Sequence, residues 1–121
     1  MSGFKLVSVV DDDQSVRESL PDLLRSFGFE ALPFASAEAF LASDGLARTA
    51  CLILDVAMPG MSGPELQQEL ARRGIAIPIV FITARTDFAA RVIERGASAC
   101  LAKPFSDTSL IEAVNVALAQ G

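Results

Sequence analysis

The chain of 121 residues contains no histidine. Zinc sites built on imidazole, Ser-His-Asp triads and self-phosphorylating histidines are therefore excluded, because each needs that side chain. The two cysteines, Cys51 and Cys100, are too few and too far apart in sequence for a metal-knuckle motif. Both stand beside apolar runs, so we expect small buried residues in a protein of a reducing compartment.

Positive charge is also scarce, with 10 Lys and Arg against 15 Asp and Glu and a net charge of −5. This balance offers no basic face for direct nucleic-acid binding, and it permits a cation site. No apolar run approaches the ~20 residues that cross a bilayer, and no signal peptide opens the chain. We expect a soluble, cytoplasmic protein without membrane contact, formed by residues 1–121 as a single domain.

What the chain does contain is a regular alternation of apolar runs and amphipathic stretches. Apolar runs predict strands at residues 5–10, 29–34, 50–54, 78–82 and 98–102. Helical spacing of apolar side chains predicts helices at residues 14–27, 37–43, 63–73, 87–95 and 108–119. This alternation indicates an α/β fold with a parallel sheet covered by helices on both faces.

The composition of the strands indicates their order. The first, third and fourth runs are apolar throughout, as buried central strands require. Glu30 and Pro33 favour an edge position for the second strand, and the short, Ala-rich fifth strand suits the other edge. With right-handed crossovers, this predicts a flavodoxin-like, doubly wound (βα)5 sheet of order 2-1-3-4-5.

Local signals also predict helix ends. Ser15 and Glu18 have the spacing of a capping box for the first helix. Gly28 and Gly74 are suited to end the first and third helices.

Polar residues follow four of the strands. In an open parallel sheet, ligands bind beyond the carboxyl ends of the strands, at the switch point between strands one and three. The residues that follow these strands are Asp11, Asp12, Asp13, Asp55, Thr83 and Lys103.

Carboxylates gathered at one rim would repel one another, and some of their pKa values would rise unless a cation intervened. Mg²⁺ suits two carboxylates, a carbonyl and waters. Lys103 supplies a positive charge and Thr83 a hydroxyl donor, so phosphoryl oxygens could be held beside Asp55. A nucleophilic aspartate, a metal and two donors are the parts that phosphoryl transfer needs.

Each residue also has a structural interpretation. The three consecutive aspartates could serve the N-terminus of a helix, Thr83 could cap a strand, and Lys103 could be an ordinary turn cation. Their joint occurrence at four strand ends favours the interpretation as a phosphoryl-transfer site.

Together these motifs resemble the receiver domains of two-component response regulators, over the whole chain from Lys5 to about Ala119. The resemblance is carried by Val9-Val10-Asp11-Asp12-Asp13, Leu54-Asp55-Val56-Ala57-Met58-Pro59-Gly60, Ile82-Thr83-Ala84 and Lys103-Pro104-Phe105. Among receivers, the chain is most similar to those of FixJ-type transcriptional regulators.

The resemblance implies that Asp55 accepts a phosphoryl group from a histidine kinase or a histidine phosphotransfer protein, without turnover as an enzyme. The reaction would need Mg²⁺, with Mn²⁺ as a substitute. The implied ligands are Asp12, Asp55, the backbone carbonyl of Ala57 and, through water, Asp11. Lys103 and Thr83 would hold the phosphoryl oxygens, and the Lys103–Pro104 peptide would be cis.

The resemblance also implies a switch. Thr83 would move toward the phosphoryl group and bias the surface formed by residues 87–95, 98–102 and 108–119. That surface would act on a downstream protein or a C-terminal effector domain, or form a homodimer on activation.

Three positions depart from or modulate the family pattern. Cys100 stands where the family usually has an aromatic residue, so the readout would be altered or carried by Phe105 or residues 87–95, unless Cys100 merely fills the core. Ala57 and Arg85 match positions beside the path of hydrolytic water. Since Ala57 has no polar group to orient water, we expect slow self-dephosphorylation.

Other functions remain as alternatives. A haloacid-dehalogenase-type phosphohydrolase would need a second acid where Ala57 stands, and a flavodoxin would need a Ser/Thr-rich loop after the first strand. An interaction module that keeps this site but works by protein contact is the stronger competitor.

Overall fold

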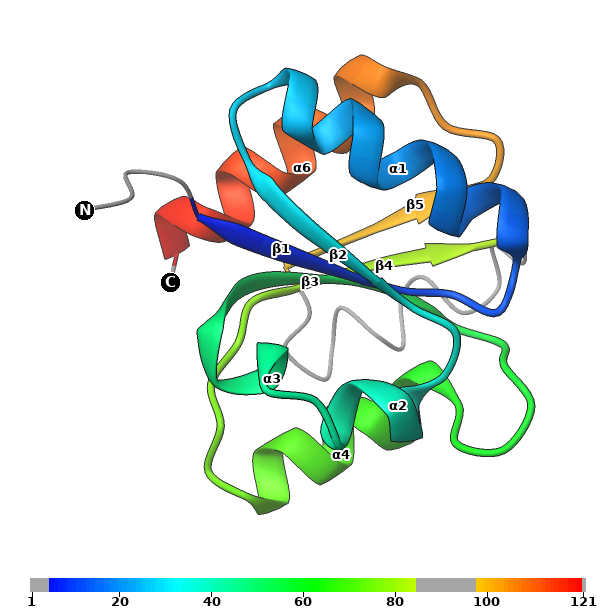
Figure 1. Cartoon of the computed structure of the whole chain (residues 1–121), viewed down its shortest axis with the longest axis vertical. Coiled ribbons are helices and arrows are strands. Elements are labelled where there is room, and N and C mark those ends of the chain that lie inside the picture. The colour runs from blue at the N-terminus through cyan, green and yellow to red at the C-terminus, as the bar shows by residue number, and fades with distance from the viewer. Residues whose placement is uncertain (1–4, 85–97, 121) are drawn as a thin grey trace.

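The computed structural model describes residues 5–84 and 98–120, and the fold is a parallel sheet between two helical layers (Figure 1). The order is β2-β1-β3-β4-β5 and every pairing is parallel, so the predicted flavodoxin-like order is confirmed. The strands are β1 Leu6–Val10, β2 Glu30–Phe34, β3 Thr49–Asp55, β4 Ile79–Thr83 and β5 Ala99–Ala102.

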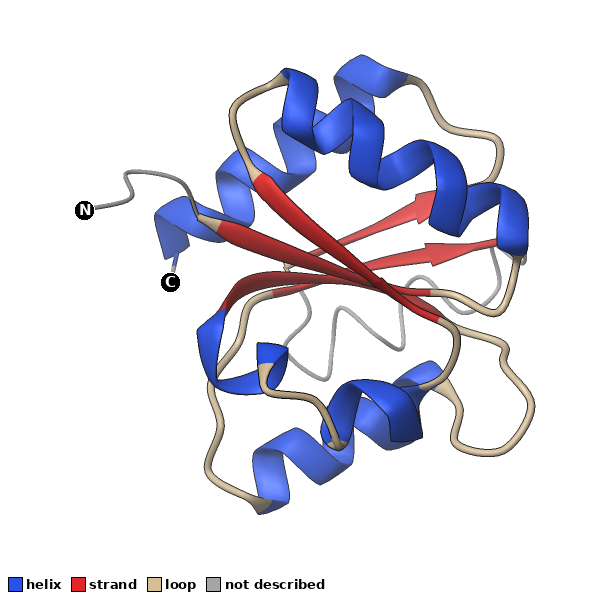
Figure 2. Cartoon of the chain, in the orientation of Figure 1, coloured by secondary structure: helices blue, strands red, loops and turns tan. Residues whose placement is uncertain are grey.

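Helices cover both faces of the sheet (Figure 2). Helices α1 and α6 lie on one face, and α2, α3 and α4 on the other. Their bounds are α1 Gln14–Ser26, α2 Ala37–Leu41, α3 Gly45–Arg48, α4 Gly63–Arg72 and α6 Asp107–Gln120. The predicted helix at residues 87–95 lies outside the described residues, and the short α3 was not predicted. Its 4 residues are too few to show a helical period.

The core consists of two apolar clusters, one on each face of the sheet. The cluster under α1 and α6 includes Val7, Val9, Leu24, Cys51, Ile53, Val80, Ile82, Leu110 and Val114. The cluster under α2 and α4 includes Val10, Phe40, Leu52, Leu54, Leu66, Leu70 and Phe81. Strands β1 and β4 are buried along their whole length, whereas β2 and β5 are only partly buried. The predicted division into central and edge strands is therefore confirmed.

The two cysteines lie on opposite faces of the sheet, and both are free thiols. Cys51 is fully buried, as predicted. Cys100 is only half-buried, because β5 is an edge strand whose side chains are incompletely covered.

The N-terminal cap of α1 differs from the prediction. The helix is capped by Asp13, whose Oδ1 accepts from the Ser15 N–H at 2.9 Å, so the proposed capping box of Ser15 and Glu18 is wrong. A carboxylate directly before the first helical residue can reach a free N–H of the first turn, whereas Ser15 is already inside the helix. The predicted role of Gly28 at the other end is confirmed by its φ of +90°.

A capping box does occur, at the start of α4. Ser62 accepts from the Glu65 N–H, and Glu65 accepts in return from the Ser62 N–H at 2.8 Å. Gly74, with φ +72°, follows the end of this helix as predicted. Within residues 5–84 and 98–120, no helix has the length and hydropathy that a bilayer crossing requires.

Candidate functional site

The carboxyl ends of the strands bring the predicted site residues together. Asp11 directly follows β1, and Lys103 directly follows β5. Asp55 and Thr83 are the last residues of β3 and β4. The sequence had predicted that each would be the first residue after its strand. One carboxylate oxygen each from Asp11, Asp12 and Asp55 lies within 4.8 Å of the other two.

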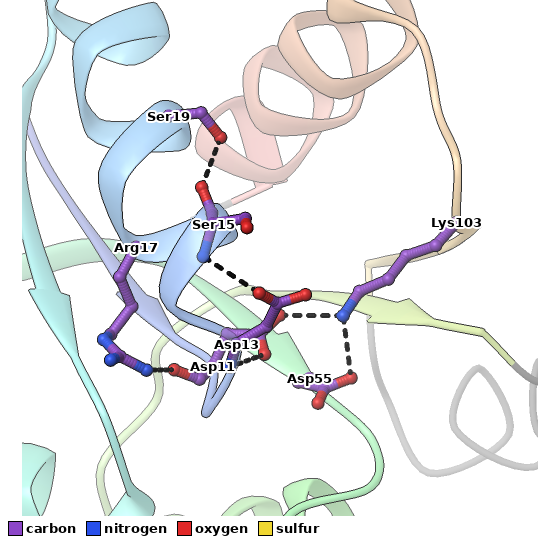
Figure 3. Close-up of polar contacts among 7 residues, drawn as sticks. All are labelled: Asp11, Asp13, Ser15, Arg17, Ser19, Asp55 and Lys103. Atoms are coloured by element: carbon purple, nitrogen blue, oxygen red, sulfur yellow. Dashed lines mark hydrogen bonds and ion pairs between the residues drawn. The ribbon is translucent and has the colours of Figure 1, made fainter.

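Asp11 is held on every side (Figure 3). Its backbone N–H donates to the Phe34 carbonyl at 3.1 Å, and its own carbonyl accepts from Arg17 Nη1 at 3.1 Å. Oδ1 accepts from the Asp13 N–H at 2.9 Å, and Oδ2 accepts from Lys103 Nζ at 3.0 Å. Asp11 is fully buried, whereas Asp12 is exposed to solvent. The Asp11 side chain is therefore fixed inside the site by hydrogen bonds, whereas the Asp12 side chain lies at the surface.

Lys103 reaches across the site from the end of β5 (Figure 3). Its Nζ lies 3.6 Å from Asp55 Oδ1 in addition to its contact with Asp11, and its backbone N–H donates to the Thr83 carbonyl at 2.7 Å. Burial acts to lower the pKa of the ammonium, but the hydrogen bond and charge of Asp11 and the charge of Asp55 outweigh it and the pKa is raised. The predicted cis peptide between Lys103 and Pro104 is present.

The pKa of Asp55 is raised by its surroundings in the site. Burial, the charge of Asp11 and, more weakly, the charge of Asp12 raise its pKa to about 6, against the opposing charge of Lys103. The rise in pKa that the sequence predicted for some of these carboxylates is therefore found at Asp55. One ammonium only partly balances three carboxylates, so the site favours a further cation.

The donor atoms fit a hard divalent ion. All three clustered side chains offer carboxylate oxygens, and no nitrogen or sulfur ligand lies among them. Ala57, the fourth predicted ligand, is exposed in the loop between β3 and α4. An ion held by these oxygens would relieve the repulsion that raises the pKa of Asp55.

The base of that loop is closely packed behind Asp55. The Gly63 N–H donates to the Val56 carbonyl at 3.0 Å. A Cβ on Gly63 would lie 2.3 Å from the Asp55 carbonyl oxygen and 2.9 Å from Phe81 Cε1. The sequence indicated Gly63 only as the start of a helix, whereas the structure shows that this glycine allows α4 to pass against the backbone of Asp55.

The remaining predicted residues divide by position. Thr83 is almost fully buried at the end of β4. Cys100 lies on β5 opposite Phe81 of β4, and burial raises the pKa of its thiol. Arg85 lies outside the described residues. Sequence reasoning missed Arg17, which donates to the Asp11 carbonyl, because a backbone acceptor leaves no pattern in the sequence. It allowed the three aspartates a place at a helix N-terminus but did not single out Asp13 as the cap.

Comparison with known proteins agrees with this geometry. The family model described as response regulator receiver domain matches residues 7–115. Nodulation protein W of Bradyrhizobium diazoefficiens is 48% identical over 90% of this chain and 49% of its own length. The transcriptional regulatory protein FixJ of Azorhizobium caulinodans is 41% identical over 93% of this chain and 54% of its own length. The chain thus spans about half the length of these curated relatives.

Solved structures give the same result. The crystal structure of FixJ-N superposes with a TM-score of 0.87 at 37% identity, covering 97% of this chain and 95% of that one. The response regulator StyR gives a TM-score of 0.89 at 46% identity, covering 98% of this chain and 61% of that one. The chain belongs to the family of response regulator receiver domains, the phosphoacceptor signalling domains of two-component systems.

Proposed function

We propose that Asp55 is the phosphoacceptor of this receiver domain and that a histidine kinase or a histidine phosphotransfer protein is the donor. The observation that carries the proposal is the cluster of Asp55 with Asp11 and Asp12 within 4.8 Å, faced by Lys103 at 3.6 Å from Asp55. A buried carboxylate between a cation site and a fixed ammonium has the surroundings that a phosphoryl group requires.

Mg²⁺, or Mn²⁺ in its place, is the proposed cofactor. Asp12, Asp55 and the Ala57 carbonyl would hold the ion, with Asp11 acting through water. When bound, the ion neutralises charge on the carboxylates and on the incoming phosphoryl oxygens. The exposure of Asp12 and Ala57 leaves the site open on the side from which an ion and a phosphodonor arrive.

The transfer itself requires few protein groups. A carboxylate oxygen of Asp55 attacks phosphorus, the P–N bond of a phosphohistidine breaks, and its electron pair returns to the imidazole nitrogen, which takes a proton from solvent. The product is an acyl phosphate on Asp55 and a neutral histidine on the donor. Lys103 and the Thr83 hydroxyl bind the phosphoryl oxygens, and Lys103 is already directed at Asp55.

We expect the acyl phosphate to be long-lived. The Ala57 side chain is a methyl group at the exposed entrance of the site, and it cannot orient a water molecule for attack. Arg85, the second position beside this path, lies outside the described residues. A phosphoryl lifetime of seconds would contradict this part of the proposal.

Partners and output follow from the same site. A groove lined by α1 residues and by the segment after β5, including Val16, Leu20, Lys103 and Phe105, is the proposed docking surface for a partner. Phosphorylation would act through Thr83 and β5 on a downstream protein or effector domain, or would favour a homodimer as the active form. Cys100 would carry less of this signal than an aromatic residue, since its side chain is small. The two free thiols of the chain, Cys51 and Cys100, favour a cytoplasmic location.

Acetyl phosphate tests the proposal directly. The protein is incubated with Mg²⁺ and acetyl phosphate and weighed intact beside Asp55→Asn, which has the same shape but no nucleophile. The wild type should gain one phosphoryl group and the variant none. A wild type that gains no mass would favour the phosphorylation-independent interaction module instead. A beryllofluoride complex, which mimics the labile acyl phosphate, provides a second probe.

A further inference from the structure

A carboxylate on α2 contacts the loop that carries Ala57. Glu38 Oε2 accepts from the Met61 N–H at 3.1 Å. Gly60, the preceding residue, has φ +73°, and a Cβ there would lie 2.9 Å from the same oxygen. The Glu38 carboxylate therefore packs against the loop backbone at Gly60 and accepts a hydrogen bond from the next residue.

The helix that carries Glu38 is anchored in the core. Helix α2 is capped by Ser36, whose Oγ accepts from the Ala39 N–H at 3.0 Å. Phe40 on the same helix is fully buried and packs edge-on against Phe34, with 5.4 Å between ring centroids. Glu38 is thus held by a helix anchored in the core, although its own side chain is exposed.

The loop is consequently fixed at two points. At its base, the Gly63 N–H bonds the Val56 carbonyl and α4 presses against the backbone of Asp55. Two residues before Gly63, the Met61 N–H donates a hydrogen bond to the Glu38 carboxylate. Ala57 lies between these points in the sequence, so both contacts restrict the loop that carries its carbonyl.

We propose that Glu38 is a positioning residue, which orients the Ala57 carbonyl for a divalent cation by holding the loop from α2. The inference rests on the proposed function, because it assumes that this carbonyl is a metal ligand. Groups that orient ligands without touching the metal commonly change its affinity severalfold or more when they are removed. Glu38 sets metal affinity in this way without contributing a ligand atom.

The test compares variants that separate reach from charge. Glu38→Gln keeps an oxygen acceptor at the same reach but loses the charge, whereas Glu38→Asp keeps the charge but is one methylene shorter. Glu38→Ala removes both, and Glu112→Ala removes an exposed helical carboxylate on α6 as the matched control. The chain has no Trp or Tyr, so Mg²⁺ binding is measured by calorimetry and by the amide shift of Ala57 rather than by fluorescence.

We expect the Mg²⁺ dissociation constant to rise at least threefold in Glu38→Ala and Glu38→Asp, and to stay within twofold of wild type in Glu38→Gln and Glu112→Ala. Hydrogen exchange of the Met61 amide, measured without metal, should accelerate about tenfold in the first two variants only. A role in stability alone would lower the melting temperature and leave the dissociation constant unchanged, which would overturn the inference.

Two other outcomes would also overturn it. If Glu38→Gln binds as weakly as Glu38→Ala, charge and not position is responsible. If the wild type binds no Mg²⁺, the proposed function fails together with this inference. Wild-type binding combined with an unchanged constant in Glu38→Ala would remove the inference and leave the proposed function intact.

Discussion

Lys103 and Asp11 form an ion pair of 3.0 Å between Nζ and Oδ2, although they stand 92 positions apart in the chain. The same Nζ lies 3.6 Å from Asp55 Oδ1. One ammonium therefore lies between a buried carboxylate and the proposed phosphoacceptor. In the metal-free protein this lysine supplies a positive charge to both carboxylates.

Replacing Lys103 by Met should destabilise the metal-free protein. With the ammonium gone, Asp11 and Asp55 repel each other inside the fold, and we expect a loss of about 1–3 kcal/mol in the free energy of unfolding at pH 8. Excess Mg²⁺ should restore most of this loss, since the ion takes over the neutralisation. Urea denaturation followed by circular dichroism, with EDTA or with Mg²⁺, measures both effects. Lys5→Met, at an exposed position, is the control; equal losses in the two variants would contradict the prediction.

Asp12 and Asp13 are adjacent acids with opposite predicted roles. Asp12→Ala should weaken Mg²⁺ binding at least tenfold and, with EDTA, stabilise the fold slightly, because the charge of Asp12 raises the pKa of Asp55. Asp13→Ala should keep Mg²⁺ binding within a few-fold and cost about 1 kcal/mol, because it removes the N-cap of α1. Calorimetric Mg²⁺ titration and urea denaturation of both variants provide the comparison. The assignment fails if the two variants exchange these phenotypes.

Asp55 predicts a pH dependence of stability in the absence of metal. Its folded-state pKa of about 6 lies above the ordinary 3.8, so the folded state binds this proton more strongly than the unfolded state. The resulting stability is fully present below the ordinary value and is lost as the pH rises through about 6.

Between pH 5 and pH 8 in EDTA, the wild type should therefore lose about 1 kcal/mol that Asp55→Asn does not lose. Denaturation midpoints of both proteins across this range measure the difference. Saturating Mg²⁺ should abolish it, because the cation favours the ionised carboxylate. Parallel curves for the two proteins would show that Asp55 does not titrate in this window.

Gly63 and Gly74 allow a matched test of packing against backbone strain. Gly63→Ala places a methyl group 2.3 Å from the Asp55 carbonyl oxygen, and we expect a loss of at least about 2 kcal/mol and of Mg²⁺ binding. Gly74→Ala meets no atom within 4 Å and should cost only about 1 kcal/mol for its positive φ. Thermal melting of both variants is the measurement. Similar melting temperatures would mean that α4 can move away from Asp55.

Much of the fold was predictable because its signals are local and periodic. Strands β1, β3 and β4 are mostly apolar since helices cover both their faces, and Pro33 marks β2 as an edge because it has no N–H for a neighbouring strand. The capping box at Ser15 failed, because a spacing rule does not indicate which residue lies just outside the helix. Helix α3 was not predicted because a single turn is too short to show a helical period in the sequence.

The amino-acid sequence by itself determined which strand ends carry Asp11, Asp55, Thr83 and Lys103, since a parallel sheet places all its carboxyl ends at one rim. Only the tertiary structure decided how these groups contact one another. The pairing of Lys103 with Asp11 and the contact of Glu38 with Met61 join residues that are distant in the sequence. The hydrogen bond from Arg17 to the Asp11 carbonyl is more local, and like the Glu38 contact it involves a backbone group. Every residue type carries the same N–H and C=O, apart from proline, so such contacts leave no signal in the sequence and appear only when the chain is folded.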